Sequence, residues 1–294
     1  MSIDPSVSTR LVAAGLEPLK IEQLISVALD EDLRYGPDVT TSSTIDVSAS
    51  VRGNIVARQA GITCGIPVAL AVLNEVNFPL QGASCDVDDG GFVEPGTIVI
   101  SLEGPLRALL LAERTMLNFL THLSGVATAT QLWVDALSGT SCRVRDTRKT
   151  LPGLRSLEKY AVRCGGGLNH RMGLGDAALI KDNHIAAAGG IVKAVTAIRQ
   201  HSPNVTVEVE CDTIDQVREA LSAGVRLILL DNMDIEMIRD SVKTASQYPG
   251  VQLEASGGLT LASAHEVGLT GVDYIAIGAL THSSSALDLA LDRV

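Results

Sequence analysis

The sequence has few aromatic side chains and no long apolar run. Phe, Trp and Tyr make up 3% of the residues, which argues against a surface that stacks nucleic-acid bases. No run of about 18 apolar residues lacks a charge or a turn signal, so a membrane-spanning helix is not expected. The first ten residues lack the charged-then-apolar order of a secretory signal peptide. These absences predict a globular protein of the cytoplasm.

Cysteine is also scarce. The five cysteines are scattered, odd in number, and never spaced as C-x-x-C. Disulfide frameworks and zinc sites typically use regular cysteine spacings. We therefore expect reduced and mostly buried thiols, at Cys64, Cys85, Cys142, Cys164 and Cys211.

Basic residues are outnumbered, yet they are concentrated in one segment. The net charge is −11, which does not favour binding to nucleic acid or to an anionic membrane. Between Arg143 and Arg171, however, eight basic residues face two acidic ones, a net charge of +6. This segment predicts a focused anion site, with Arg148, Arg171 and Lys181 as the best candidates to face inward. Three other cations, spaced four residues apart, are predicted to form a solvated helix face: Arg155, Lys159 and Arg163.

The first part of the chain has the pattern of a small mixed α and β unit. Helices are predicted at Ile21–Leu29 and Ala69–Glu75, and strands at Val51–Ile62 and Thr97–Leu102. The stretch 106–137 has high helix propensity, and Gly125 is expected to divide it into two helices. We place a domain boundary in this stretch, so that residues 1–121 form the first domain and residues 122–294 the second.

From residue 142 onward, short β-branched runs alternate with helix-length segments, which predicts βαβ units around a parallel sheet. Each run ends in polar or glycine residues. In a barrel all of these ends surround one pocket, whereas in an open sheet only those beside the switch point matter. Six runs are fewer than eight, so we expect an incomplete barrel. The runs are Cys142–Thr147, Ala178–Asp182, Val205–Cys211, Leu227–Asp231, Val251–Ser256 and Tyr274–Gly278.

Carboxylates close two successive runs. Glu210 and Asp231 could hold Mg²⁺ together with substrate phosphates, act as a general acid and base, or pair with the cations. Small residues follow the last two runs, at Ser256-Gly257-Gly258 and at Gly278-Ala279. Backbone N–H groups there could approach a phosphate.

Two further glycine patterns carry less weight. Gly173 to Ala178 fits G-x-G-x-x-A, but it precedes a strand, whereas the dinucleotide fingerprint must follow one. The run Gly165-Gly166-Gly167 predicts a flexible loop, either a lid or a linker. His170 follows this loop beside Arg171, which makes it the most interesting of the six histidines.

These blocks together resemble the quinolinate phosphoribosyltransferase family. The resemblance lies in the segments 146–155, 158–162, 165–171 and 179–185, and continues through 207–210, 229–232, 254–258 and 277–278. In the first domain Glu31-Asp32, Asp38 to Thr41, Gly61, Gly65 and Glu113 to Asn118 also agree. The resemblance covers nearly the whole chain from about residue 22. Pro37, between Gly36 and Asp38, is the one departure, and it affects only a loop.

The resemblance implies an N-terminal α/β sandwich domain followed by an incomplete, six- or seven-stranded α/β barrel. It also implies transfer of phosphoribose from phosphoribosyl pyrophosphate to quinolinate, with decarboxylation to nicotinate mononucleotide in NAD biosynthesis. The implied cofactor is Mg²⁺, and the implied assembly is a homodimer, or a higher oligomer, in which Arg114 reaches the partner's site.

The resemblance also assigns roles to individual residues. Quinolinate would be surrounded by Arg114, Arg148, His170 and Arg171. Lys149 and Lys181 would lie near pyrophosphate and quinolinate, with Glu210 and Asp231 serving Mg²⁺ and ribose; these four are the predicted catalytic residues. The 5-phosphate would be held by Ser256, Gly257, Gly258, Gly278 and Ala279. Thr147 and Ile277 are expected to line the same site.

Other functions compete with this one. Lys181 at a strand end could be the amine of a Schiff-base aldolase. The barrel could instead bind carboxylates without catalysis, or use nicotinate as the acceptor. The number of cations exceeds what one carboxylate needs, which favours quinolinate. No Ser-His-Asp or reactive-cysteine arrangement suggests covalent catalysis.

Overall fold

The computed structural model describes residues 3–293, which divide into two compact units. The first unit comprises residues 3–129, 151–166 and 283–293, and the second comprises residues 130–150 and 167–282. The chain thus returns to the first unit twice, so no single boundary in the sequence separates the two units. The predicted boundary between residues 121 and 122 stays a prediction about the domains. None of the helices in the described part of the chain has both the length and the apolarity to cross a membrane.

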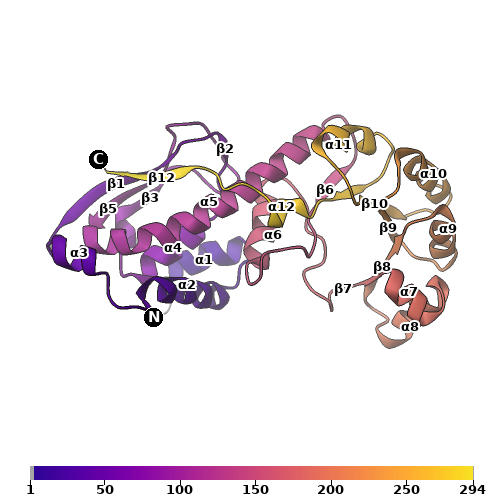
Figure 1. Ribbon diagram of the computed structural model, residues 1–294, viewed down its shortest axis with the longest axis horizontal. Coiled ribbons are helices and arrows are strands. Elements are labelled where there is room, and N and C mark those ends of the chain that lie inside the picture. The colour runs from indigo at the N-terminus through magenta and orange to yellow at the C-terminus, as the bar shows by residue number, and fades with distance from the viewer. Residues whose placement is uncertain (1–2, 294) are drawn as a thin grey trace. The chain divides into compact units, whose positions relative to one another are not determined.

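The first unit is built on an antiparallel sheet in the order β12-β1-β5-β3, with a separate pair β2-β4. Helices α1, α2, α4 and the start of α5 lie along one side of the sheet (Figure 1). Ile55 and Ile100 face each other on β1 and β5 and are fully buried. The elements are α1 (Pro5–Ala13), α2 (Pro18–Leu33), α3 (Val39–Thr44), β1 (Ser50–Ala57), β2 (Gly61–Ile62), α4 (Ile66–Glu75), η1 (Leu80–Gly82), β3 (Ala83–Cys85), β4 (Phe92–Val93), β5 (Ile98–Pro105), α5 (Leu106–Ala136), α6 (Arg155–Cys164) and β12 (Leu289–Arg293).

Three expectations for this unit were wrong. Helix α5 runs unbroken through Gly125, because this glycine makes room for another segment: a Cβ there would lie 2.1 Å from the backbone oxygen of Ser285. The strand predicted at Val51–Ile62 is two strands, β1 and β2, in different sheets. Lys159 is fully buried on α6, so the three cations of that helix do not form one solvated face.

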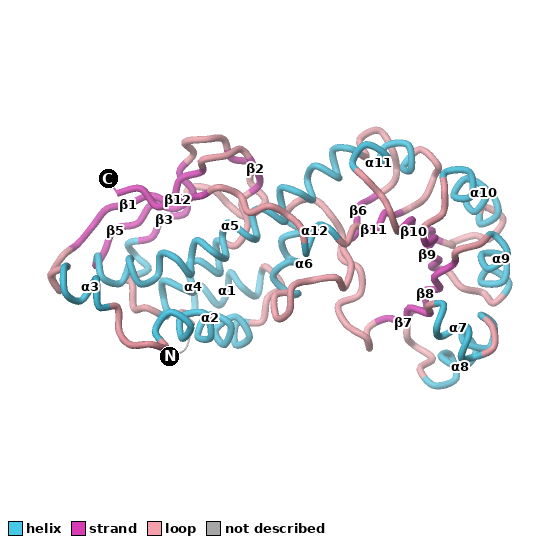
Figure 2. Tube along the Cα trace, viewed as in Figure 1, coloured by secondary structure: helices cyan, strands magenta, loops and turns pink. Residues whose placement is uncertain are grey.

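The second unit is a singly wound parallel sheet. Its strand order, β6-β11-β10-β9-β8-β7, is that of a ring of consecutive strands opened between β6 and β7. Strands β7 to β10 follow an arc with helices on its outer side (Figure 2). The incomplete barrel expected from the sequence is confirmed. The strands are β6 (Arg143–Arg145), β7 (Ala177–Ile180), β8 (Thr206–Cys211), β9 (Leu227–Asp231), β10 (Gln252–Ser256) and β11 (Tyr274–Ala276).

The helices of this unit start soon after the strands, at side-chain caps. Thr213, Asp234 and Thr260 each accept a hydrogen bond from the third backbone N–H of the helix that follows. Such caps satisfy N–H groups that a helix cannot pair internally, and they fix the short loops after β8, β9 and β10. The helices are α7 (Asp182–Ala188), α8 (Ile191–His201), α9 (Ile214–Ser222), α10 (Ile235–Ala245), α11 (Leu261–Gly268) and α12 (Ala279–His282).

Candidate active site

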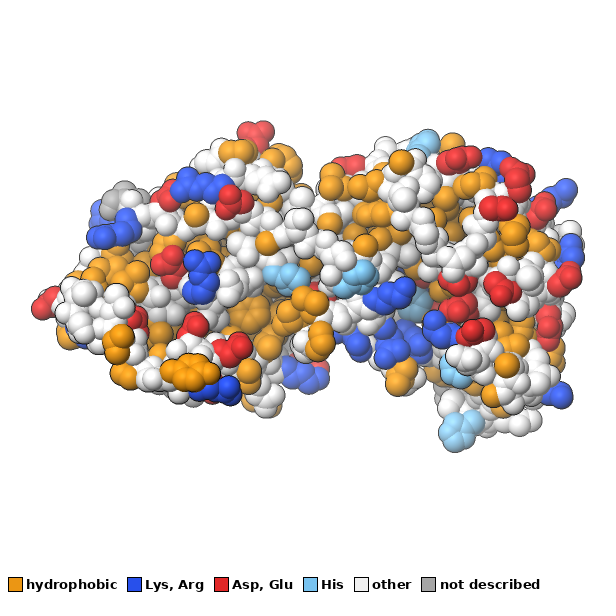
Figure 3. Space-filling model, in the orientation of Figure 1, with side chains coloured by type: hydrophobic (Ala, Val, Ile, Leu, Met, Phe, Trp, Pro, Cys, Tyr) orange, Lys and Arg blue, Asp and Glu red, His pale blue; other side chains and the backbone are white. Residues whose placement is uncertain are grey.

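A cavity of about 490 Å³ lies at the carboxyl ends of the strands of the second unit. Lys and Arg side chains gather in this part of the surface, close to acidic ones (Figure 3). The volume suits a small-molecule ligand. The predicted site residues that line the cavity are Thr147, Arg148, Lys149, His170, Arg171, Lys181, Glu210, Asp231, Ser256, Gly257 and Gly258.

The two-residue period of the strands explains why these side chains converge. Side chains two apart on a strand point to the same face, so each strand presents an inner and an outer residue to the barrel interior. Three strands contribute such pairs: Glu208 with Glu210, Leu229 with Asp231, and Glu254 with Ser256. All of these residues border the cavity except Glu208.

Two arginines supply positive charge to the cavity. Arg148 Nε is buried and has no hydrogen-bond partner within residues 3–293. Arg171 donates from a guanidinium N–H to the carbonyl oxygen of Ala177 at 2.9 Å. Burial, and then the nearby charge of Arg148, lower the pKa of Arg171 from its usual value. Two nearby cations, one of them with a buried N–H that no described residue accepts, are suited to an anionic ligand.

His170 is fixed by the protein on both sides of its ring. Its Nδ1 accepts the backbone N–H of Arg171 at 2.7 Å, so Nε2 carries a proton and donates to Glu208 Oε2 at 2.8 Å. The buried Asp146 accepts the backbone N–H of His170 at 2.8 Å. These contacts place His170, and through it the backbone of Arg171.

Two buried carboxylates beneath the cavity escaped prediction. Glu208 and Glu254 are 1% and 0% exposed, and Glu254 pairs with Arg145. Burial first, and then the charge of Glu208, raise the pKa of Glu254 to about 7. The alternation Glu208-Val209-Glu210 was the available signal, because it puts two carboxylates on one face of a strand. The inner member of each pair lies before the end of its strand, so a pattern of strand ends does not reveal it.

Opposite charges meet at the mouth of the cavity. Lys181 Nζ lies 2.9 Å from Glu210 Oε2, and its backbone N–H donates to His184 Nδ1, which anchors the residue at the start of α7. Asp231 Oδ2 accepts from the side-chain amide of Asn232 at 2.8 Å. Two carboxylates and one amide oxygen are the hard oxygen ligands that Mg²⁺ prefers. The residues present therefore fit a magnesium ion.

The glycine loop after β10 follows a path that only glycine allows easily. Gly257 and Gly258 have φ angles of +90° and +61°. A Cβ on Gly257 would lie 2.2 Å from the side-chain oxygen of Asn232, so the loop passes close to the loop after β9. A bare backbone at this position can present N–H groups to a phosphate.

The remaining predicted residues lie outside the lining. Gly278 lies against the cavity wall: a Cβ there would be 2.9 Å from Lys149 Cδ and 3.4 Å from Thr147 Oγ1. Ile277 is buried, and its N–H donates to the backbone of Arg145. Ala279 begins the four-residue helix α12. Arg114 is exposed on α5 within the first unit and does not line this cavity.

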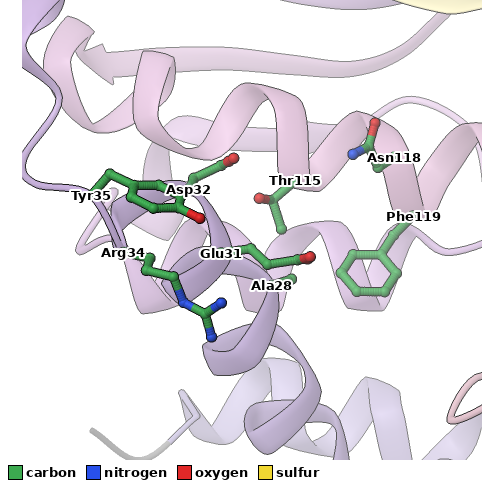
Figure 4. A pocket seen from close by; sticks show the side chains of 8 residues that line it. All are labelled: Ala28, Glu31, Asp32, Arg34, Tyr35, Thr115, Asn118 and Phe119. Carbon is green, nitrogen blue, oxygen red and sulfur yellow. The ribbon is translucent and has the colours of Figure 1, made fainter.

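A second cavity, of about 430 Å³, lies in the first unit. Figure 4 shows Glu31, Asp32 and Tyr35, from α2 and the turn after it, near Thr115 and Asn118 on α5. The pairs Glu31-Asp32 and Thr115–Asn118 belong to the first-domain motifs that agree with the family. Those motifs, distant in sequence, are thus brought together around one cavity.

Comparison with known proteins decides the family. The family model described as the C-terminal domain of quinolinate phosphoribosyl transferase matches residues 126–292, and the model of its N-terminal domain matches residues 38–124. The chain belongs to the quinolinate phosphoribosyl transferase family. The family resemblance stated from the sequence is confirmed, as is its two-part fold.

Relatives extend this result over almost the full length. A carboxylating nicotinate-nucleotide pyrophosphorylase of Mycobacterium leprae is 50% identical over 90% of this chain and 94% of its own. The solved nicotinate-nucleotide pyrophosphorylase of Francisella tularensis is 39% identical, with a TM-score of 0.88, and the match covers 94% of this chain and 96% of the other. The corresponding structure from Ehrlichia chaffeensis is 40% identical, with a TM-score of 0.87, over 92% and 98% of the two chains.

Proposed function

We propose that the chain catalyses transfer of phosphoribose from phosphoribosyl pyrophosphate to quinolinate, releasing pyrophosphate and carbon dioxide and forming nicotinate mononucleotide for NAD biosynthesis. The observation that carries this proposal is the make-up of the barrel cavity. One cavity combines two close arginines, a lysine–carboxylate pair and a glycine loop. A dicarboxylate acceptor, a pyrophosphate leaving group and a terminal phosphate require these three kinds of group. The full-length relatives named for this activity support the same conclusion.

Arg148 and Arg171 are proposed to bind the two carboxylates of quinolinate. Guanidinium groups match planar carboxylates, and Arg148 Nε has no partner of its own among the described residues. His170 is proposed to act mainly through position, since both ring nitrogens already have partners in the protein. Its ring borders the cavity, where it can pack against the pyridine ring, and it holds the backbone of Arg171 in place.

The ribose and phosphate ends are proposed to lie at the mouth of the cavity. The loop Ser256-Gly257-Gly258 offers backbone N–H groups to the 5-phosphate, and Gly278 keeps the wall beside Lys149 open. Glu210 and Asp231 would hold Mg²⁺, with Lys149 and Lys181 near the pyrophosphate. When bound, Mg²⁺ supplies positive charge that neutralises a pyrophosphate as it departs.

The reaction needs no protein nucleophile. The pyridine nitrogen attacks the anomeric carbon of the ribose while the bond to pyrophosphate breaks. Negative charge grows on the leaving group, where Lys149 and Lys181 stabilise it, and a carboxylate can stabilise the positive charge of the ribose. Once bonded to the ribose, the ring nitrogen is cationic, so the adjacent carboxylate can leave as carbon dioxide, because that nitrogen stabilises the carbanion left on the ring. The carbanion then takes a proton from water to give nicotinate mononucleotide.

We also propose that the active unit is a homodimer, or a larger assembly of dimers, in which Arg114 enters the partner's cavity. Arg114 is exposed on α5, within the motif Glu113 to Asn118, and it does not line the cavity described above. A third arginine would then complement the two that each chain provides for itself. A cytoplasmic location is likewise a proposal, consistent with the sequence composition.

Mg²⁺ dependence tests the proposed roles of Glu210 and Asp231. We expect Glu210→Gln and Asp231→Asn each to raise the Mg²⁺ concentration for half-maximal activity by about 10- to 100-fold, the range typical when a metal site loses a supporting group. A chelator should abolish turnover, and added Mg²⁺ should restore it. Initial rates measured across a Mg²⁺ titration give the result.

A matched control is the same kind of substitution at a carboxylate outside the cavity. Asp215 is an exposed carboxylate on α9 that pairs with Arg218 outside the cavity, so Asp215→Asn should leave the Mg²⁺ dependence unchanged. If both Glu210→Gln and Asp231→Asn showed the Mg²⁺ dependence of the wild type, these two residues would not be the Mg²⁺ ligands.

A further inference from the structure

Two cysteines far apart in the sequence meet in the first unit. The Sγ atoms of Cys64 and Cys164 and a carboxylate oxygen of Asp89 all lie within 4.8 Å of one another. Cys64 directly precedes Gly65, the N-cap residue of α4, and Cys164 is the last residue of α6. The five thiols in the structure are all free.

The two thiols differ in access. Cys64 is fully buried, and its backbone is fixed by hydrogen bonds in both directions with the hydroxyl of Ser124. Cys164 is partly exposed and lines a cavity of about 470 Å³ together with Arg163 and Arg10. Cys164 is therefore the more accessible of the two to a small oxidant in that cavity.

The surroundings also favour Cys164 as the reactive partner. A hydrogen bond from the Cys64 thiol lowers the pKa of Cys164, while burial and the charge of Asp89 oppose the shift. Tyr160 and Arg163 make smaller contributions that lower the pKa. Burial raises the pKa of Cys64 well above its usual value. An accessible thiol with a lowered pKa beside a second thiol is typical of redox-sensitive cysteines.

A metal ion is the alternative ligand for this cluster, and the structure favours it less. Structural zinc sites have four protein ligands, whereas this cluster offers three. The Asp89 carboxylate is already occupied: it accepts the backbone N–H groups of Gly65 and Ile66 at 3.0 Å each and the hydroxyl of Tyr160 at 2.7 Å. Asp89 therefore serves to cap α4 and to hold α6 in place.

We propose that Cys164 and Cys64 are a redox pair that a hydroperoxide converts to a disulfide. The Cys164 thiolate attacks the peroxide: an S–O bond forms, the O–O bond breaks, and the leaving oxygen takes a proton to become water or an alcohol. The Cys64 sulfur then attacks the sulfenic sulfur of Cys164. An S–S bond forms and the S–O bond breaks, and hydroxide leaves with the Cys64 proton as water. Two thiols are oxidised and one peroxide is reduced.

The test is peptide mapping of the full-length protein after treatment with hydrogen peroxide at low molar excess. We expect one linked peptide pair joining Cys64 to Cys164, lighter than the two free peptides by two hydrogen atoms and separated by dithiothreitol. In Cys64→Ser, a dimedone adduct should accumulate on Cys164, because its sulfenic acid has no resolving thiol. Cys85→Ser is the control, since Cys85 is also partly exposed but is not paired with a thiol, and this variant should still form the link.

Mapping the wild-type protein does not depend on the stability of any variant. Oxidation of Cys85 before Cys164, or of Cys164 to the sulfinic acid without a link to Cys64, would overturn the proposal. The proposal would also be overturned if the isolated protein held one zinc ion per chain and if Cys64 and Cys164 reacted with a thiol reagent only after that zinc was removed. Quinolinate turnover does not enter these readouts, so the test stands apart from the proposed function.

Discussion

Replacing Arg171 with alanine is expected to reduce kcat/KM for quinolinate by about 30- to 4,000-fold, and Arg148→Ala should do the same. The estimate corresponds to roughly 2–5 kcal/mol, the cost of removing one partner from a buried, hydrogen-bonded charge pair. Both arginines line the cavity, and the buried Nε of Arg148 has no hydrogen-bond partner among the described residues. Steady-state kinetics with quinolinate varied at saturating phosphoribosyl pyrophosphate measures the loss.

Two further variants distinguish specific binding of quinolinate by these arginines from a general effect of positive charge. Arg143→Ala removes an exposed arginine from the other end of β6 and should leave the kinetics within experimental error of wild type. Arg171→Lys retains the charge but not the planar pair of donors, so it should recover only part of the lost affinity. If Arg148→Ala and Arg171→Ala both keep wild-type kcat/KM, the quinolinate pocket is not where we place it.

A hybrid dimer tests whether Arg114 acts across the interface. Arg114→Ala and Lys181→Ala should each lose at least about 30-fold in activity as homodimers, since each lacks a charge required at every site. Co-expressed with different affinity tags, the two variants give hybrid dimers that can be purified. These should recover about half of wild-type activity, because one of the two sites then contains only wild-type residues.

The control is a hybrid dimer of two variants that are both altered in the second unit of the chain. Hybrids of Lys149→Ala with Lys181→Ala should stay inactive, because neither site of the dimer is intact. Absence of recovery in the Arg114→Ala and Lys181→Ala hybrid, with the dimer intact by light scattering, would mean that Arg114 acts within its own chain.

The strands and the outer layer of the site could be predicted, because both depend on local patterns. β-branched runs that end in Glu210, Asp231 and Ser256 indicate parallel strands, and parallel strands carry their ends to one edge. Arg148, Lys149 and Arg171 were identifiable from charge, since they lie in a segment that is basic in an otherwise acidic chain, and Lys181 was identifiable from its place at the end of a strand.

The remaining features depend on contacts between distant segments, which a local pattern does not reveal. Gly125 was expected to break a helix, but its role is to admit the backbone of Ser285. Lys159 has the spacing of a surface residue and is nevertheless buried. Glu254 has a raised pKa because it is buried and because Glu208, on a strand that is not its neighbour, lies close to it. The same holds for Cys64 and Cys164, one hundred positions apart and joined only by the fold.

The most direct test of the proposed reaction is release of labelled carbon dioxide from carboxyl-labelled quinolinate, with phosphoribosyl pyrophosphate and Mg²⁺ each present or omitted. We expect release only when both are present, with nicotinate mononucleotide formed in equal amount. Folded, dimeric protein that releases no label under these conditions would contradict it, as would release that does not require phosphoribosyl pyrophosphate.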